Sequence, residues 1–432
     1  MIDLAQLFGS KDAGGSILNI LYFIMFMAFI FLGPRIYLWQ ALAKIEASAQ
    51  KLEKIAADGR KSVFKFSSKH GGKSKDAKKR IDHFMDFFMI PPVDLDPFGI
   101  MKKLEHLVRG TEDRFKKAAH EIAPKANSEE VMDVYMGLQA AVTINMIAKI
   151  VRHWAELMKK FKNFQFAMIF QMQLPIIEKL VEAEEKGLNA FLNGEAIGDG
   201  AGPLVIASLL DKEGKEIAED VISASKKMWG HNITFVKARG PGGRLGELGD
   251  AVLKLSKRNR KLGKIITIDA AQKLEGEKTG SVAEGIGVAI GGVGIERAKI
   301  EEIAVKYNIP LDAIAIKMSP FEAISPMPTE VADSIAGATE LLKERVLDTK
   351  KGSQIIVVGV GNTCGIPNTK KNLKNVLKKI KTRAKKMKEQ EKEEESGWFL
   401  APSGKKKGED TGEGLFANMI NFLFARIGMP AV

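Results

Sequence analysis

The segment "KIITIDA" (264–270) decides the fold class of this chain, because it is a short run of mostly β-branched residues that ends beside an aspartate. Runs of this kind form strands that are buried on both faces of a sheet. Similar runs recur at 232–238 ("NITFVKA"), 313–319 ("AIAIKMS") and 354–362 ("QIIVVGVGN"). Helical patterning separates them at 249–261, 299–307 and 330–346. The alternation predicts an α/β core at 195–367, a three-layer and mostly parallel sheet with helices on both faces.

An apolar run of 22 residues without a charge lies far upstream, at 13–34. As a helix it extends about 33 Å, enough to cross a hydrocarbon core of about 30 Å. A cleaved signal peptide is the alternative, but the residues before the run are slightly acidic and no A-x-A site follows it. Tyr37 and Trp39 come next and suit a membrane interface. We therefore predict a transmembrane anchor at 1–39 that contacts the lipid bilayer through 13–34.

Charge predicts the orientation of this anchor. Lys11 is the only basic residue before the apolar run, whereas Arg35, Lys44 and Lys51 begin a basic series after it. The positive-inside rule places the N-terminus outside the cell membrane and the bulk of this single-pass chain in the cytoplasm. The net charge of +13 suits a body held near anionic lipid. Nucleic-acid binding is disfavoured, because aromatic residues rarely interleave with the basic ones. The single cysteine, Cys364, fits a reducing compartment.

The region at 40–126 is predicted to be a helical and basic juxtamembrane segment. Apolar residues at 42–55 continue the anchor helix at helical spacing. Residues 60–80 hold nine Lys or Arg and one acid, which predicts a mobile basic segment along the lipid headgroups. The stretch "FMDFFMIPPVDLDPFGI" (84–100) is too apolar for a free linker, so we expect it to pack on the next domain or to enter the membrane interface.

A helical domain is predicted at 127–194. Residues 127–163 show one apolar face at helical spacing, and 164–174 are even more apolar. The uncharged run there is only 15 residues long, which is too short for a second membrane span and predicts a buried helix pair. Burial between two copies is the other possibility, so 127–192 is also a candidate surface for a homo-oligomer.

The C-terminal tail is predicted to have two parts. Residues 368–413 are dominated by charge and predict a solvated helix followed by a linker. Residues 414–432 contain "GLFANMINFLFARIG" (414–428), which is too short to span a bilayer but has a broad apolar face. We expect this helix to lie in the membrane interface, with docking on a partner as the alternative.

Candidate ligand-binding residues follow the predicted strands, since ligands of open α/β sheets bind at the carboxyl ends of the strands. The loop "RGPGGRLGELG" (239–249) comes after the first strand and opens a helix. Glycine N–H groups and a helix N-terminus can hold an anion, although an unliganded turn is an equal possibility. The candidates in this loop are Arg239, Gly240, Gly242, Gly243 and Arg244.

Two aspartates are the candidate catalytic residues. Asp269 falls where the strand "KIITI" ends and is followed by Lys273 and Glu275, two further binding candidates. Asp199 lies in "IGDGAGPLV" (197–205), where it either caps a helix or pairs with Asp269. Such a pair can activate water or bind a divalent metal, the one cofactor that the residues suggest. The segment "GVGNTCGIPN" (359–368) adds Asn362 and Thr363 as ligand-binding candidates.

The chain resembles the archaeal "domain of unknown function 1512" family. The features that carry the resemblance are the N-terminal anchor, "IPPVDLDPFG", "IGDGAGPLV", "IDAAQKLEGEKTGSVAEGIGVAIGG" and "GVGNTCGIPN". The resemblance extends from the anchor to about residue 368. It implies no particular activity.

The α/β core is more distantly similar to the hydrogenase-maturation and spore-germination protease fold. That fold shows a strand ending in G-x-G-N, an acid before G-x-G-P and an Asp that ends a later strand. Asp199 within "GDGAGP" matches the first acid and Asp269 the second, and the resemblance implies that they bind metal or position water. Here "GVGN" (359–362) follows both acids, an order that a circular permutation of the sheet would produce.

Two classes of function follow. The first is a membrane-anchored protein whose cytoplasmic domain binds an anionic small molecule or serves as a scaffold. The alternative is a membrane-tethered peptidase or hydrolase that uses Asp199 and Asp269.

Overall fold

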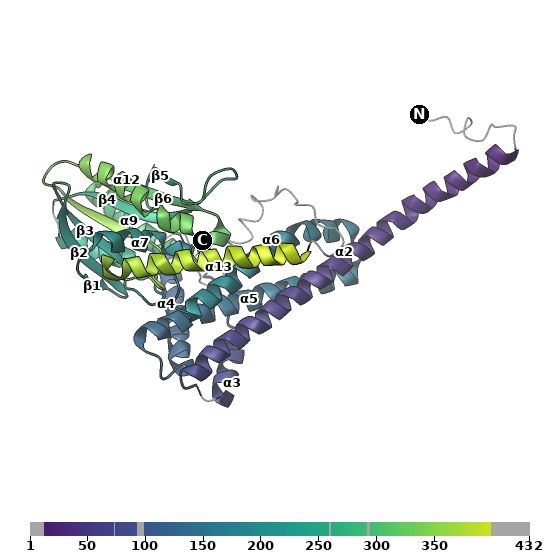
Figure 1. The fold of residues 1–432 in the computed structure, drawn as a ribbon, viewed down its shortest axis with the longest axis horizontal. Helices are drawn as coiled ribbons and strands as arrows, with labels where there is room; N and C mark the ends of the chain where they lie inside the picture. Colours follow the sequence, from purple (N-terminus) through teal and green to yellow (C-terminus); the bar gives the residue numbers. More distant parts are fainter. Residues whose placement is uncertain (1–12, 73, 93–98, 259–260, 292–293, 399–432) are drawn as a thin grey trace. The chain divides into compact units, whose positions relative to one another are not determined.

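A computed structural model describes residues 13–72, 74–92, 99–258, 261–291 and 294–398 (Figure 1). Helices occupy the chain up to residue 192, and a sheet with further helices follows. The first helices are α2 (Ala13–Lys69), α3 (Ser74–Phe84), α4 (Ile100–Ile122), α5 (Ser128–Phe161) and α6 (Phe164–Leu192). The predictions for 93–98, for the linker at 399–413 and for the helix at 414–428 lie outside the described residues.

The chain divides into two compact units. The first comprises residues up to 54 together with 147–179, and the second comprises 55–146 and the residues from 180 onward. In the first unit, α2 buries the stripe of Ile45, Ala49 and Leu52, as the helical spacing predicts. Arg152 of α5 pairs with carboxylates of α2, with N–O distances of 2.7 Å to both Glu46 and Glu53.

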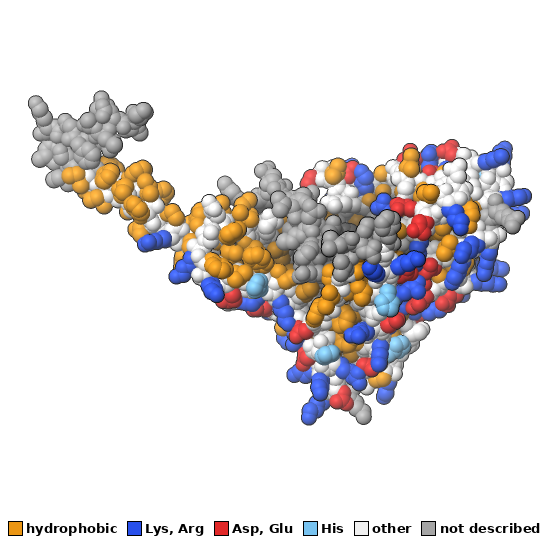
Figure 2. Space-filling view, turned by 180° about the vertical axis from the view of Figure 1, so that it is seen from behind, with side chains coloured by type: hydrophobic (Ala, Val, Ile, Leu, Met, Phe, Trp, Pro, Cys, Tyr) orange, Lys and Arg blue, Asp and Glu red, His pale blue; other side chains and the backbone are white. Residues whose placement is uncertain are grey.

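Two of the described helices are long and apolar enough to cross a membrane. The apolar window of α5 is 78% buried, which is typical of a core helix. The window of α2 is not buried at all, and Figure 2 shows its hydrophobic side chains on the surface. This helix therefore has the properties of a membrane span or a signal sequence.

The prediction of a buried helix pair at 164–174 is only partly correct. Ala167 and Leu174 of α6 are buried, but Phe166, Ile169 and Met172 are exposed. The run is apolar on several sides of α6, and the neighbouring helices cover only part of that surface.

The prediction of a mobile basic segment at 60–80 is wrong for the residues described there. Residues up to Lys69 continue α2, and α3 begins at Ser74. The reason is a sparse apolar stripe among the lysines, since Val63, Ala77 and Ile81 are buried. The basic side chains occupy the remaining faces of these helices.

The second unit contains a mixed seven-stranded sheet in the order β1-β2-β3-β7-β4-β6-β5. Its centre is parallel: β3 pairs with β7, β7 with β4 and β4 with β6. Its margins are antiparallel, which corrects the prediction of a mostly parallel sheet. The predicted strands are β3 (His231–Ala238), β4 (Leu262–Gln272), β6 (Leu311–Met318) and β7 (Gln354–Gly359). The strands not predicted are β1 (Lys215–Ala218), β2 (Val221–Met228) and β5 (Val282–Ile286).

Alternate strand residues contribute to two hydrophobic clusters. Phe235, Ile268 and Val357 belong to the cluster that contains α7 (Ala201–Leu209) and α12 (Ile335–Leu347). Val236 and Val358 belong to the cluster that contains α8 (Leu248–Arg258) and α9 (Ile295–Tyr307). The short helices α10 (Pro320–Ile324) and α11 (Thr329–Asp333) lead into α12, so the helix predicted at 330–346 is broken in two. The charged tail forms α13 (Leu373–Trp398), as predicted.

Candidate functional site

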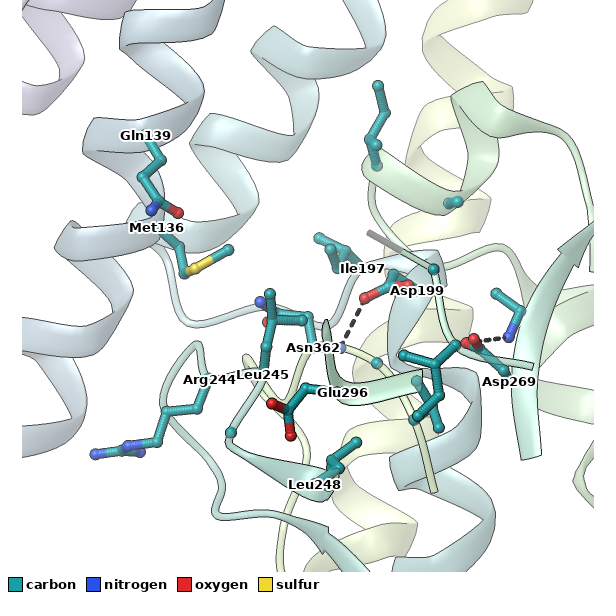
Figure 3. Close-up of a pocket in the computed structure, with 18 of the residues that line it drawn as sticks. Met136, Gln139, Ile197, Asp199, Arg244, Leu245, Leu248, Asp269, Glu296 and Asn362 are labelled. Carbon is teal, nitrogen blue, oxygen red and sulfur yellow. Dashed lines mark hydrogen bonds between the residues drawn. The ribbon is translucent and has the colours of Figure 1, made fainter. Parts of the chain in front are cut away.

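A cavity of about 290 Å³ lies in the second unit, at the carboxyl edge of the parallel strands (Figure 3). The ends of β4 and β6 and the turn after β7 line one side, and helices α4, α5 and α6 line the other. Figure 3 shows Met136 and Gln139 of α5 across from Asp199 and Asp269. Because ligands of open α/β sheets bind at this edge, the cavity is the candidate site.

Asp199 lies in the short 3₁₀ turn Gly198–Gly200 that leads into α7. Its Oδ2 accepts a hydrogen bond of 2.7 Å from the backbone N–H of Asn362, and no side-chain cap bond is formed with α7. Gly361 makes this contact feasible, because its φ of +127° and its close approach to the Asp199 carbonyl oxygen leave no room for a side chain. Burial raises the pKa of Asp199, whereas the Asn362 bond opposes that rise.

Asp269 lies just beyond the point where β4 parts from β7, since the last pair between these strands is Ile268 with Gly359. Its Oδ1 accepts a 2.7 Å hydrogen bond from the N–H of Ala270. Burial raises the pKa of Asp269 well above its usual range, and the charge of Asp199 raises it further. The two predicted carboxyl groups therefore line one cavity and interact electrostatically.

Gly202 explains how α7 comes close enough to the sheet to bring Asp199 to this cavity. A Cβ atom at this position would collide with the carbonyl oxygens of Ile268 and Val360 and lie 2.7 Å from the Val360 nitrogen. Only glycine lets the helix backbone approach these two strand ends. The glycines of "GDGAGP" thus serve close packing of backbone on backbone.

Carboxyl groups outnumber cations around the cavity. The nine acids that line it are Glu105, Glu112, Glu184, Asp199, Glu219, Asp220, Glu247, Asp269 and Glu296. The three cations are Arg109, Lys116 and Arg244, and each forms ion pairs with carboxylates of the chain. Four acids form no ion pair among the described residues: Glu112, Glu184, Asp199 and Asp269.

The helical side of the cavity contains residues that sequence reasoning missed. Burial raises the pKa of Glu112 to about 7 and that of Glu184 to about 8. Nearby, Gln139 donates a 3.1 Å hydrogen bond to the Tyr135 hydroxyl. One signal was present in the sequence: Glu184 interrupts the apolar stripe between Val181 and Leu188.

The glycine-rich loop at 239–249 is divided: residues 244–248 line the cavity, and residues 239–243 do not. Its N–H groups bind carboxylates from α5: Gly242 donates to Glu129 at 2.7 Å and Gly243 to Asp133 at 2.9 Å. Arg244 is buried and pairs with Glu129 and, at 3.0 Å, with Asp220. The predicted anion cradle therefore already holds acids of the chain itself.

The other predicted binding residues have varied positions. Gly240 donates to Asn368, and Arg239 lies 3.4 Å from Glu216 at the surface, both outside the cavity lining. The hydroxyl of Thr363 is buried and bonds to backbone carbonyls of the loop, including that of Gly242 at 2.8 Å. Lys273 and Glu275 do not line the cavity either.

Asn362 does line the cavity, and hydrogen bonds hold both its backbone N–H and its side-chain oxygen. Its N–H binds Asp199, and its Oδ1 accepts a 2.9 Å hydrogen bond from the N–H of Cys364. This bond orients the amide, so that the buried Nδ2 has no protein partner among the described residues. The amide donor of Asn362 is therefore a buried and unsatisfied group beside the cavity.

No group of three or more His, Cys, Asp or Glu side chains suited to a metal ion occurs in the described part of the chain. The divalent metal stays a prediction. The polar groups at the sheet side of the cavity include the two carboxyl groups of Asp199 and Asp269 and the side-chain N–H donor of Asn362.

The fold and this site define a class: an α/β domain, joined to a helical region, with a buried carboxylate pair at the sheet edge. The chain belongs to the DUF1512 family. The model of its N-terminal domain, described as a protein of unknown function, matches residues 19–194. The model of its C-terminal domain, described as a domain of unknown function, matches residues 197–367. No curated protein and no solved structure matches the chain.

Proposed function

We propose that this chain is a membrane-anchored hydrolase that cleaves the bond between an acyl carbon and its leaving group, such as a peptide bond. Asp199 and Asp269 are its acid–base pair. The observation that carries the proposal is the burial of both carboxyl groups on one cavity without a cationic partner among the described residues. Paired buried carboxyl groups hold a shared proton at a pH where isolated ones are ionised. Such groups are typical of catalytic sites.

Burial raises the pKa of both aspartates, so the pair holds a proton at a pH where isolated aspartates are ionised. We propose that Asp269, whose pKa the charge of Asp199 raises as well, carries this proton and acts as the acid. Asp199 is stabilised as the ionised base by the N–H of Asn362. As a water oxygen attacks the carbonyl carbon, Asp199 takes a proton from the water and Asp269 gives its proton to the carbonyl oxygen. Collapse of the tetrahedral intermediate then transfers a proton to the leaving group and regenerates the pair.

The resemblance of the core to the hydrogenase-maturation and spore-germination protease fold supports the same reaction class. Asp199 and Asp269 match its two acids in sequence. The two hydrophobic clusters, formed by alternate strand residues, support a three-layer arrangement for this core.

The charge of the cavity favours hydrolysis over the capture of an anion. An anionic ligand would face unpaired carboxyl groups, whereas the loop cations and N–H groups are bonded within the chain. A substrate with a neutral or basic group near the scissile bond fits this wall better. The scaffold hypothesis, with a homo-oligomer through 127–192, stays a prediction.

We further propose that α2 anchors the enzyme in the cell membrane with its N-terminus outside. The exposed apolar side chains of its first half and the aromatic residues Tyr37 and Trp39 support this position. The basic residues from Arg35 onward support a cytoplasmic second unit.

The test compares hydrolysis of a panel of fluorogenic peptides that carry basic, neutral or acidic side chains beside the scissile bond. Asp269→Asn and Asp199→Asn remove one carboxyl group each and keep its shape. Each should lower turnover at least about 100-fold, the usual contribution of a general acid or base. Glu340→Gln, at an exposed acid of α12, is the matched control and should behave like the unmodified chain. Equal turnover in all four proteins would refute the proposal.

A further inference from the structure

The tip of the helical hairpin formed by α5 and α6 lies beside α2. Helix α5 ends at Phe161, Lys162 turns the chain with a φ of 50°, and α6 begins at Phe164. The ring of Phe164 meets that of Tyr37 edge to face, with 5.2 Å between centroids. Ion pairs from Arg152 and Lys159 to Glu46 attach the same hairpin to α2 further along. The tip therefore stands level with Tyr37, within the first unit.

Tyr37 marks the place where α2 leaves its helical neighbours. Before this residue the helix exposes its apolar side chains, as at Phe29, whose exposed fraction is 75%. After it, Ala41 and Ile45 are buried. If the exposed half is the membrane anchor, this level corresponds to the lipid headgroups, where Tyr and Trp are enriched.

The tip presents exposed apolar side chains at this same level. The exposed fractions are 67% for Phe161 and 60% for Phe166. The apolar face continues along α6 with Ile169, 55% exposed, and Met172, 66% exposed, at intervals of three residues. These two residues lie further from Tyr37, because α6 follows α2 toward the contact of Glu178 with Ser48 and Lys51. Isolated exposed apolar residues need no explanation, but a continuous face of this kind marks an interaction surface.

The charges around the hairpin tip indicate what kind of surface it contacts. Lys160 and Lys162 flank the turn of the hairpin and are exposed, whereas the neighbouring Lys159 pairs with Glu46 and Glu156. A basic rim around an apolar tip is the pattern of a surface that enters an anionic membrane interface. A second copy of the chain would instead bring these lysines against their own counterparts.

We propose that the tip of the α5–α6 hairpin is a second membrane contact, inserted among anionic lipid headgroups beside the α2 anchor. This inference rests on the proposed membrane anchor and is independent of the hydrolase. With two points of contact fastened together by ion pairs, the first unit has a defined orientation on the bilayer instead of pivoting about one helix.

Nitroxide labels on the full chain test this proposal in vesicles of phosphatidylcholine and phosphatidylglycerol. Cys364 is fully buried, so single introduced thiols can be labelled selectively. Phe166→Cys reports on the tip, with Phe161→Cys as a second variant at the end of α5. Phe29→Cys is the control for the lipid core, and Ala47→Cys, exposed on α2 beyond the tip, is the control for water. Collisions with oxygen report lipid, and collisions with an aqueous nickel chelate report water.

We expect oxygen to dominate at positions 29, 161 and 166 and the nickel chelate to dominate at 47. Nickel dominating at 161 and 166 while oxygen dominates at 29 would overturn the hairpin contact and leave the anchor intact. Nickel dominating at 29 as well would overturn the anchor itself. Low collision rates with both reagents at 166 would show that protein covers the tip, as in a homo-oligomer, and would also overturn the proposal.

Discussion

Replacing Glu184 by Gln tests whether this carboxyl group of the cavity wall stays protonated in the folded chain. Glu184 is nearly buried on α6 and forms no ion pair among the described residues, and burial raises the pKa of its carboxyl group from 4.5 to about 8. The folded chain therefore keeps a proton that the unfolded chain releases above pH 4.5. Under linkage, a group with a raised pKa makes the folded state less stable as the pH rises through this window.

The magnitude follows from the width of the window. Each pH unit between the unfolded and folded pKa values removes about 1.4 kcal/mol of unfolding free energy. From pH 4.5 to 7 the loss is about 3 kcal/mol for Glu184 alone. Gln has nearly the same shape and no charge at any pH, so Glu184→Gln should match the parent chain near pH 4.5 and exceed its stability by about that amount at pH 7.

Thermal unfolding in detergent, followed at pH 5, 6, 7 and 8, measures this difference. The midpoint of Glu184→Gln should rise above that of the parent chain by an increasing margin as the pH increases. Glu340→Gln removes an exposed acid that forms a surface ion pair with Lys343, so its profile should run parallel to the parent's. Parallel profiles for Glu184→Gln and the parent would show that Glu184 is ionised in the folded chain and would refute the reasoning.

Three further predictions concern the architecture and chemistry of the site. Gly202→Ala should lower stability by at least about 2 kcal/mol in thermal unfolding, because its methyl group meets backbone atoms. Gly110→Ala, with open space around it on α4, should instead gain about 0.5–1 kcal/mol. Arg244→Met should cost about 3 kcal/mol by leaving the partly buried carboxylates of Glu129 and Asp220 unpaired, whereas Arg239→Met at the surface should cost under about 1 kcal/mol. An alkyl epoxide should esterify the aspartate pair at intermediate pH only, detected by peptide mass, because one carboxylate must attack while its protonated neighbour Asp269 protonates the epoxide oxygen.

The central strands could be predicted because their apolar runs have one physical cause. A parallel strand that is covered on both faces has no polar alternation, and β3, β4, β6 and β7 all show this property. The antiparallel strands at the margins of the sheet lack such a continuous apolar run. β2 carries Ser-Lys-Lys before its last residue, Met228, and β5 is largely exposed, so neither carries a hydrophobic signal that a short window can detect.

The candidate site was predictable on the sheet side and hidden on the helix side. Asp199 and Asp269 follow from the rule that strand ends form the binding edge, a property of chain topology. Glu112 and Glu184 reach the same cavity only through the packing of α4 and α6 in the second unit, which no local pattern specifies. The glycine-rich loop shows the same limit. Its N–H groups do bind carboxylates, but these acids are Glu129 and Asp133, more than 100 positions earlier in the chain.

The stability of the fold does not explain why unpaired acids line this cavity. Each buried carboxyl group without a cation carries a desolvation cost, and apolar side chains of similar size would remove that cost. Glu184 in particular sits on a stripe where leucine would continue the pattern of Val181 and Leu188. Departures from consistent patterning are expected where a site performs chemistry, because the strain that lowers stability also sets the proton affinities. We therefore propose that the acids on the helical wall and the aspartate pair form one functional surface, and their proton affinities should respond together to whatever occupies the cavity.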